Sequence, residues 1–138
     1  MAKPITGGCL CGRVRYRADA APILVTHCHC TICRRQSGAA FLTWASFPSA
    51  AFTITQGTPA LFKATKKAER SFCAECGTPL SFRFFTAPGE IDVTVGSLDD
   101  PNAMQPQDHI WTSTRLHWLE LADDLPRYPD ERRGAKGG

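Results

Sequence analysis

The sequence predicts a mainly β fold with little helix. Short segments rich in β-branched and aromatic residues recur at close intervals along the 138 residues, and clusters of glycine, proline and aspartate separate them as turns. Only the short stretch 31–37 is a candidate for helix. A chain of this length fits one domain with its own core. We expect that domain to span residues 1–129, with a flexible C-terminal tail at 130–138.

Seven segments are expected to form strands. In Arg13–Arg17, Val14 and Tyr16 fall on one face and three arginines on the other, which is the alternation of a half-buried strand. The other six are Ile23–Thr26, Phe41–Trp44, Phe52–Thr55, Leu61–Ala64, Leu80–Phe85 and Ile91–Val95.

Charge and hydropathy exclude several classes of protein. A formal net charge of +3 is too small to indicate a nucleic-acid or anionic-membrane partner. No apolar run approaches the roughly 18 residues that a membrane-spanning helix needs. The first eight residues contain no apolar signal core, so we expect a cytoplasmic protein.

The cysteine content points to metal binding. Seven cysteines cannot pair completely in disulfides, and a reducing cytoplasm disfavours such pairing. Cys9 and Cys11 are expected to point to the same side of an extended backbone, while Cys73 and Cys76 have the spacing of a zinc knuckle. Gly77 follows as a residue suited to positive φ. These four thiolates, here called the outer cluster, supply a closed tetrahedral zinc site that would join two distant parts of the chain; buried core thiols are the alternative.

Three further cysteines, Cys28, Cys30 and Cys33, form what we call the inner cluster. The first two are expected at a strand end and the third in the following turn, so all three can converge on a second zinc and leave a fourth position open. Because side chains alternate along a strand, His27 and His29 should point away from Cys28 and Cys30, which favours the open site. A fourth ligand from either histidine is the alternative.

Arg34 and Arg35 directly follow the last ligand of the inner cluster. Three thiolates and one Zn²⁺ sum to −1, which a guanidinium would partly neutralise, so both are candidates for anchoring a substrate carboxylate or the charged site. Ordinary surface arginines are an equally good interpretation.

The cysteines and their neighbours resemble a known family, the glutathione-dependent formaldehyde-activating enzymes, which includes centromere protein V. The residues that carry the resemblance are Gly8, Cys9, Cys11, Gly12, Val14 to Tyr16, Cys28, Cys30, Cys33, Arg34, Phe72, Cys73, Cys76 to Leu80, Gly96 to Asp99, His109 to Trp111 and Leu125 to Arg127. The resemblance implies a β-tent fold of stacked antiparallel sheets stapled by a structural zinc. It also implies two Zn²⁺ per chain, with the outer cluster structural and Cys28, Cys30 and Cys33 catalytic.

The named reaction of that family joins glutathione to formaldehyde. The resemblance therefore implies a carbon–sulfur lyase similar to S-(hydroxymethyl)glutathione synthase, with a small thiol such as glutathione as its partner. The alternatives are a non-catalytic zinc scaffold, a glutathione carrier and a redox-sensing zinc protein.

Other residues carry weaker signals. His109 is a candidate for lining the inner site as a proton-transfer group, although the run His109–Trp111 is more typical of a strand with a buried tryptophan. Trp44 could form an apolar wall for a substrate, and core packing is the commoner role. Lys66 and Lys67 could attract the carboxylates of glutathione, but exposed loop lysines need no such role.

Overall fold

A computed structural model describes residues 3–132, and within them the chain forms two β-sheets, one α-helix and four short 3₁₀ turns. The strands are β1 (Ile5–Gly8), β2 (Arg15–Ala18), β3 (Leu24–Cys28), β4 (Leu42–Pro48), β5 (Phe52–Gln56), β6 (Ala60–Phe62), β7 (Ala68–Phe72), β8 (Pro79–Phe84), β9 (Glu90–Thr94) and β10 (Asp108–Ile110). The helix α1 is Thr31–Ser37, and the 3₁₀ turns are Ser49–Ala51, Val95–Ser97, Pro101–Ala103 and Thr112–Thr114. The prediction of a mainly β protein with little helix is confirmed.

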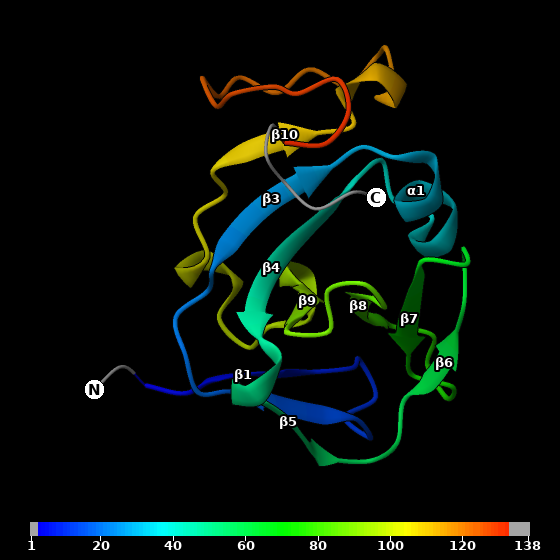
Figure 1. The fold of residues 1–138 in the computed structure, drawn as a ribbon, viewed down its shortest axis with the longest axis vertical. Coiled ribbons are helices and arrows are strands. Elements are labelled where there is room, and N and C mark those ends of the chain that lie inside the picture. The colour runs from blue at the N-terminus through cyan, green and yellow to red at the C-terminus, as the bar shows by residue number, and fades with distance from the viewer. Residues whose placement is uncertain (1–2, 133–138) are drawn as a thin grey trace.

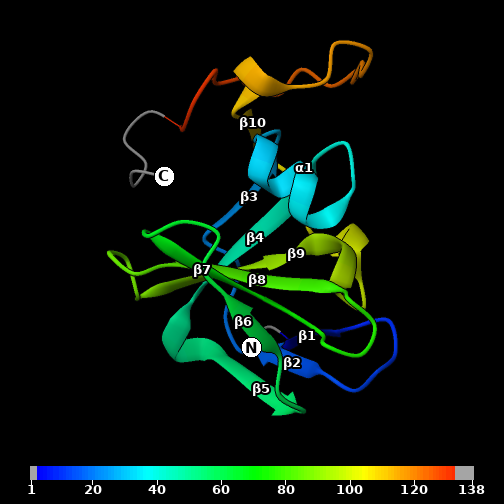
Figure 2. The same ribbon diagram turned by 90° about the vertical axis from the view of Figure 1, so that its right-hand side faces the viewer.

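The two sheets are of unequal size. The small sheet has the order β1-β2-β5, and the large one the order β10-β3-β4-β9-β8-β7-β6. Neighbouring strands are antiparallel except for β10 and β3, which run parallel. The small sheet lies at one end of the molecule and β10 at the other, while α1 sits beside the ends of β3 and β7 (Figures 1 and 2).

The main core lies between the two sheets. Tyr16 of β2 packs there with Phe47 of β4 and Val93 of β9, and all three are almost completely buried. The Tyr16 hydroxyl hydrogen bonds to Ser97 Oγ at 2.6 Å, and burial raises the pKa of this phenol to about 12. Burial keeps this phenol neutral, and the bond to Ser97 satisfies its buried hydroxyl and ties the small sheet to the Val95–Ser97 turn.

The seven predicted strands and the predicted helix all have counterparts in the structure. Strands β1 and β7 were not predicted, for different reasons. β1 contains Gly7, where an added Cβ would meet the Tyr16 hydroxyl at 2.5 Å, so glycine is needed for close packing rather than for a turn. β7 buries the polar residues Arg70 and Ser71, which breaks the expected alternation.

The run His109–Trp111 is only partly a strand. β10 ends at Ile110, and Trp111 adopts the left-handed φ of 57° and is half-buried. The expectation of a strand with a buried tryptophan is therefore wrong at Trp111, because the backbone leaves the sheet at that residue.

The last described residues return to the large sheet. The backbone N–H of Trp111 donates to the carbonyl of Asp130 at 2.8 Å, and Arg132 pairs with the buried Asp108. Most of the predicted tail, residues 133–138, lies outside the described residues. Among residues 3–132, no helix combines the length and the apolar character that crossing a membrane requires.

Candidate functional site

The outer cluster forms where two turns meet. Cys9 and Cys11 lie in the turn between β1 and β2, and Cys73 and Cys76 lie in the turn between β7 and β8. Their four Sγ atoms are all within 4.8 Å of one another. The structure thus brings together two pairs that are separated by more than 60 residues in the sequence, as the spacing predicted.

The backbone of the first pair differs from the expectation. Cys9 and Cys11 do not lie on an extended segment, because Gly12 N–H donates to the Cys9 carbonyl at 3.1 Å and closes a turn. Gly77 closes the second turn in the same way, donating to the Cys73 carbonyl at 2.8 Å with φ of 82°, so the prediction of positive φ there is confirmed. Two similar turns therefore face each other across the cluster.

Polar hydrogens surround the outer sulfurs. The Val14 N–H donates to Cys9 Sγ at 3.2 Å, and the Thr78 hydroxyl lies 3.2 Å from Cys76 Sγ. The hydrogen bond from Thr78 lowers the pKa of the Cys76 thiol to about 5. At Cys76 this environment favours the thiolate, which is the form that binds metal.

The inner cluster is built at the start of α1. Cys28 ends β3, Cys30 is the N-cap of α1, and Cys33 lies in the first turn of the helix. Cys33 Sγ is 3.5 Å from Cys28 Sγ, and the Cys33 N–H donates to Cys30 Sγ at 3.3 Å. The thiolate at the N-cap thus takes the place of the usual hydroxyl or carboxylate cap, and the helix start fixes the triad.

Both clusters have the dimensions of a zinc site. A tetrahedral ion with zinc–sulfur bonds of about 2.3 Å would separate its sulfurs by about 3.8 Å. The separations include 3.5 Å for Cys9–Cys11, 3.7 Å for Cys11–Cys73 and 3.5 Å for Cys28–Cys33. Either group of cysteines could therefore hold a metal ion, and an all-thiolate donor set is typical of zinc.

The three inner thiols share negative charge unequally. Hydrogen bonds from Cys28 and Cys33 lower the pKa of Cys30 to about 2, and the Cys33 N–H and the charge of Arg70 act in the same direction. The pKa of Cys28 rises because its proton is held by Cys30 and Cys33 and because it is buried. Cys30 is also the more exposed member of the triad, so it carries the first negative charge on the accessible side.

Arg70 is the residue that sequence reasoning missed. It is 4% exposed, and its guanidinium donates to Cys33 Sγ through both terminal nitrogens, at 3.5 and 3.6 Å. It also donates to Gln36 Oε1 at 2.9 Å and stacks over the rings of Trp44 and Phe82. A buried guanidinium must be paired, and here its partner is a candidate metal ligand.

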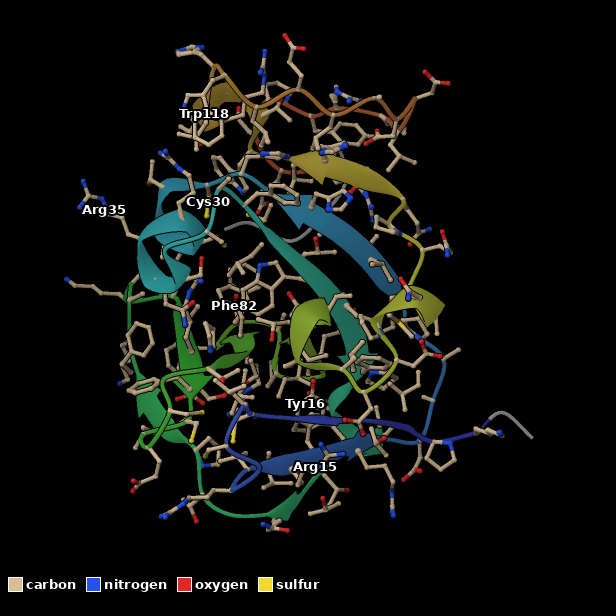
Figure 3. The ribbon with its side chains drawn as sticks, turned by 180° about the vertical axis from the view of Figure 1, so that it is seen from behind. Arg15, Tyr16, Cys30, Arg35, Phe82 and Trp118 are labelled. Atoms are coloured by element: carbon tan, nitrogen blue, oxygen red, sulfur yellow. The ribbon has the colours of Figure 1, made fainter. Side chains whose placement is uncertain are left out.

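Arg34 and Arg35 occupy a different place. They line a shallow hollow with Leu116 and Trp118 and do not line the cavity that opens from the inner cluster. Arg35 extends from α1 into solvent, away from Cys30 and Phe82 (Figure 3). The charge expected beside the inner cysteines is therefore supplied by Arg70, and a binding role for Arg34 and Arg35 stays a prediction.

The histidines form a cluster of their own. His29 Nε2 lies 2.9 Å from His109 Nδ1, and His109 Nε2 lies 3.0 Å from both carboxylate oxygens of Asp123. His27 stacks on His109 and hydrogen bonds to Thr43. In a neutral imidazole only one ring nitrogen donates, so with the His109 Nε2–H given to Asp123, a neutral His109 uses Nδ1 to accept from His29 Nε2–H.

This arrangement turns the histidines away from the sulfurs. Within residues 3–132 no histidine nitrogen joins the inner cysteines as a possible ligand, in agreement with the side-chain alternation. His109 is 1% exposed and does not line the cavity beside the inner cluster, so the structure does not bring it to that site. Burial, together with His109 and His27, lowers the pKa of His29 to about 4, so this ring is neutral at pH 7.

A cavity of about 820 Å³ opens from the inner cluster. All three inner cysteines line it, together with Arg70 and the apolar side chains Trp44, Phe82, Phe84, Ile110 and Trp111. Lys66 and Lys67 line its rim. Trp44 fits both roles expected of it: it is 5% exposed, as a core residue should be, and it lines the cavity, as a substrate wall should.

Comparison with known proteins decides the family. The profile of the family described as "Glutathione-dependent formaldehyde-activating enzyme" matches residues 4–114, a range that contains all seven cysteines. This chain belongs to that family. Membership supports a function related to glutathione or formaldehyde.

Individual relatives agree with the family. An uncharacterized lyase of Schizosaccharomyces pombe is 33% identical over 86 residues, covering 56% of this chain and 56% of the yeast protein. The chain thus spans little more than half the length of that relative. A Halomonas elongata protein named for the same family is 24% identical over 141 residues, covering 92% of this chain and 90% of that protein.

A solved structure confirms the fold. The crystal structure of a Rhodobacter sphaeroides protein superimposes with a TM-score of 0.58 at 21% identity, covering 88% of this chain and 98% of the other. At this identity the likeness concerns the architecture alone.

Proposed function

We propose that this chain is a zinc-dependent enzyme of the carbon–sulfur lyase type that acts on the adduct of a small thiol and an aldehyde, similar to S-(hydroxymethyl)glutathione synthase. The observation that carries the proposal is the inner cluster, where three thiols converge at a cavity large enough for a ligand. Three protein ligands and an accessible space are the pattern of catalytic zinc sites, whereas four ligands are the pattern of structural ones.

Cys28, Cys30 and Cys33 would hold the catalytic ion, and Cys9, Cys11, Cys73 and Cys76 the structural one. When bound by three thiolates, zinc supplies a Lewis acid with one open coordination position. The two sites together correspond to two Zn²⁺ per chain.

The side chains around the inner cluster prepare the site for thiol chemistry. Arg70 places a positive charge against Cys33, which offsets the excess negative charge of three thiolates. The guanidinium packs over the rings of Trp44 and Phe82 and Arg70 is 4% exposed, and this exclusion of water strengthens its interaction with the sulfur. Addition of a thiol to an aldehyde forms a carbon–sulfur bond and moves the thiol proton to the carbonyl oxygen, and the reverse step releases both reactants.

Further parts of the proposal follow from the thiol ligands. Cysteine ligands must stay reduced, which favours the cytoplasm. Glutathione is the proposed thiol partner, because the family is dependent on it. We also propose that residues 1–129 act as one zinc-binding domain.

Metal analysis and exchange spectroscopy test the proposal. The purified chain should contain two zinc ions, and Cys28→Ala should contain one. NMR exchange spectroscopy should show that the enzyme accelerates exchange between free and adduct-bound formaldehyde with glutathione, and Cys30→Ala should lose the effect. Two zinc ions without any acceleration would instead indicate a scaffold or a carrier, and zinc release on mild oxidation would indicate a redox sensor.

A further inference from the structure

The walls of the inner cavity are mostly apolar. Trp44 and Phe82 have ring centroids 6.0 Å apart, and Phe84 meets Phe82 edge-on at 4.7 Å. Ile110 and Trp111 add further apolar lining. Formaldehyde has only two non-hydrogen atoms, whereas a cavity of about 820 Å³ is in the range that encloses a drug-sized ligand.

Three hydroxyl groups in the lining, those of Ser46, Thr26 and Thr114, already have protein partners. Ser46 Oγ donates to Asp92 Oδ1 at 2.5 Å, and the Thr26 hydroxyl donates to Asp108. Thr114 donates to the carbonyl of His29 at 3.0 Å. These bonds face the protein, so the hydroxyls offer a ligand only their remaining acceptor capacity.

The arginines in the lining are committed in the same way. Arg83 pairs with Glu69 at 3.0 Å, and Arg132 pairs with the buried Asp108. Arg70 spends its guanidinium on Cys33 and Gln36 and lies over the aromatic rings. The arginines along the walls are therefore already paired, and the exposed Lys66 and Lys67 lie at the rim.

These features distinguish between classes of thiol and aldehyde. An amide or a charge that is buried against these walls without a partner costs about tenfold in affinity. Each methylene buried against these walls instead gains roughly fourfold. We propose that the substrate of this site carries an apolar body, aromatic or branched aliphatic, attached to the reacting sulfur or the reacting aldehyde carbon.

This inference rests on the proposed function and names its substrate class. The bond changes are those of hemithioacetal formation: the thiol sulfur bonds to the aldehyde carbon, the C=O π bond breaks, and the thiol proton moves to the oxygen. No oxidant or reductant is involved. The apolar body lies along Trp44, Phe82 and Phe84 while the reacting atoms meet at the inner cluster.

Exchange spectroscopy with matched reactant pairs tests the inference on the full, metal-loaded chain. One arm uses 2-mercaptoethanol with 3-phenylpropanal, a second uses benzyl mercaptan with formaldehyde, and the reference pair is glutathione with formaldehyde. At least one apolar pair should be accelerated about tenfold more than the reference. The arm that responds identifies whether the aldehyde or the thiol carries the apolar body.

A binding measurement gives a second readout that does not depend on turnover. The unreactive 3-phenylpropanol should quench tryptophan fluorescence, because Trp44 and Trp111 line the cavity. Phe84→Ala should weaken its binding about tenfold, with Phe84→Leu as the milder change if the alanine variant does not fold. Phe85→Ala is the matched control, because Phe85 is the next residue on the chain and does not line the cavity.

The outcomes separate the inference from the function on which it rests. Acceleration of the reference pair without a preference for either apolar pair would overturn the inference and leave the proposed function standing. If no pair is accelerated, the proposed function fails, and the binding measurement then tests the selectivity of the cavity by itself. Binding of 3-phenylpropanol that is weakened by Phe84→Ala and not by Phe85→Ala supports the apolar selectivity. Absent binding, or equal weakening in both variants, overturns it.

Discussion

Replacing Arg70 by methionine removes the buried cation beside the inner cluster while keeping a long side chain against Trp44 and Phe82. The guanidinium lies 3.5 Å from Cys33 Sγ. Two unit charges at that distance interact by about 5 kcal/mol at an effective dielectric constant of about 20. If the net charge of −1 is shared equally among three sulfurs, the attraction between Arg70 and the charge on Cys33 is about a third of that energy, or about 1.5 kcal/mol. Arg70→Met should therefore weaken metal binding at the inner cluster at least about tenfold, within the range for groups that support metal ligands.

A competition titration measures this effect. Zinc is withdrawn from the chain by a chromophoric chelator, and the inner and outer ions are told apart by comparison with Cys28→Ala. Arg70→Met should shift only the release of the inner ion, and Arg70→Lys should restore part of the affinity because it keeps the charge. Arg83→Met is the matched control, since Arg83 lines the same cavity but pairs with Glu69 instead of a cysteine.

Three results would refute this reasoning. An equal shift for Arg83→Met would mean that the overall charge of the cavity matters and the contact with Cys33 does not. An equal weakening of both zinc sites would mean that Arg70 supports the fold as a whole, and thermal unfolding of the metal-loaded variants would then show a matching loss of stability. Unchanged release of the inner ion would remove Arg70 from the site.

Two further predictions concern stability. Because burial lowers the pKa of His29 to about 4, the unfolded chain, whose histidine has a pKa of about 6.5, binds its proton first as the pH falls. The free energy of unfolding should therefore fall as the pH drops from 6.5 to 4, by about 2 kcal/mol from pH 7 to pH 5. Urea unfolding at several pH values should show a smaller fall in His29→Gln than in the wild type, and an equal fall in both would contradict the prediction. Gly57→Ala should cost about 2 kcal/mol or more, because Gly57 has φ of 78° and an added Cβ would lie 2.2 Å from the Arg13 carbonyl oxygen. Gly89→Ala, where a Cβ meets nothing within 4 Å, should leave the melting temperature nearly unchanged, and equal losses in both variants would contradict the steric reason.

The cysteine spacing predicted both clusters because it encodes local geometry. The turn after Cys73 needs a residue with positive φ, and the glycine at position 77 predicts that turn. Both ends of α1 have a local cause. Cys30 caps the start of the helix, and Gly38 ends it in the left-handed conformation with φ of 74°. What spacing could not give is which turns face each other, because that depends on the order of strands in the large sheet.

The sequence also could not identify which arginine lies beside the inner cluster. Arg34 and Arg35 are neighbours of Cys33 in sequence, but each residue of a helix rotates the side chain by about 100°, so both turn away from its sulfur. Arg70 reaches Cys33 from another strand, 37 positions later. Its local sequence gives no signal, since a charged residue in a short polar run is usually exposed. The excess negative charge of the predicted zinc site predicts a nearby cation, but it does not identify the residue that supplies the cation.

The surroundings of the two clusters argue for different chemistry more strongly than the number of thiols does. Both offer sulfurs at similar separations, and each has at least one sulfur outside the buried core. The outer sulfurs lie where two turns meet, with Cys11 exposed, and no outer cysteine lines the large cavity. The inner sulfurs border that cavity beside a buried guanidinium and aromatic walls. A ligand from solution can therefore approach the inner cysteines, and the metal ion that they could hold, inside a space that selects its shape. Such selection is what makes a reactive site specific.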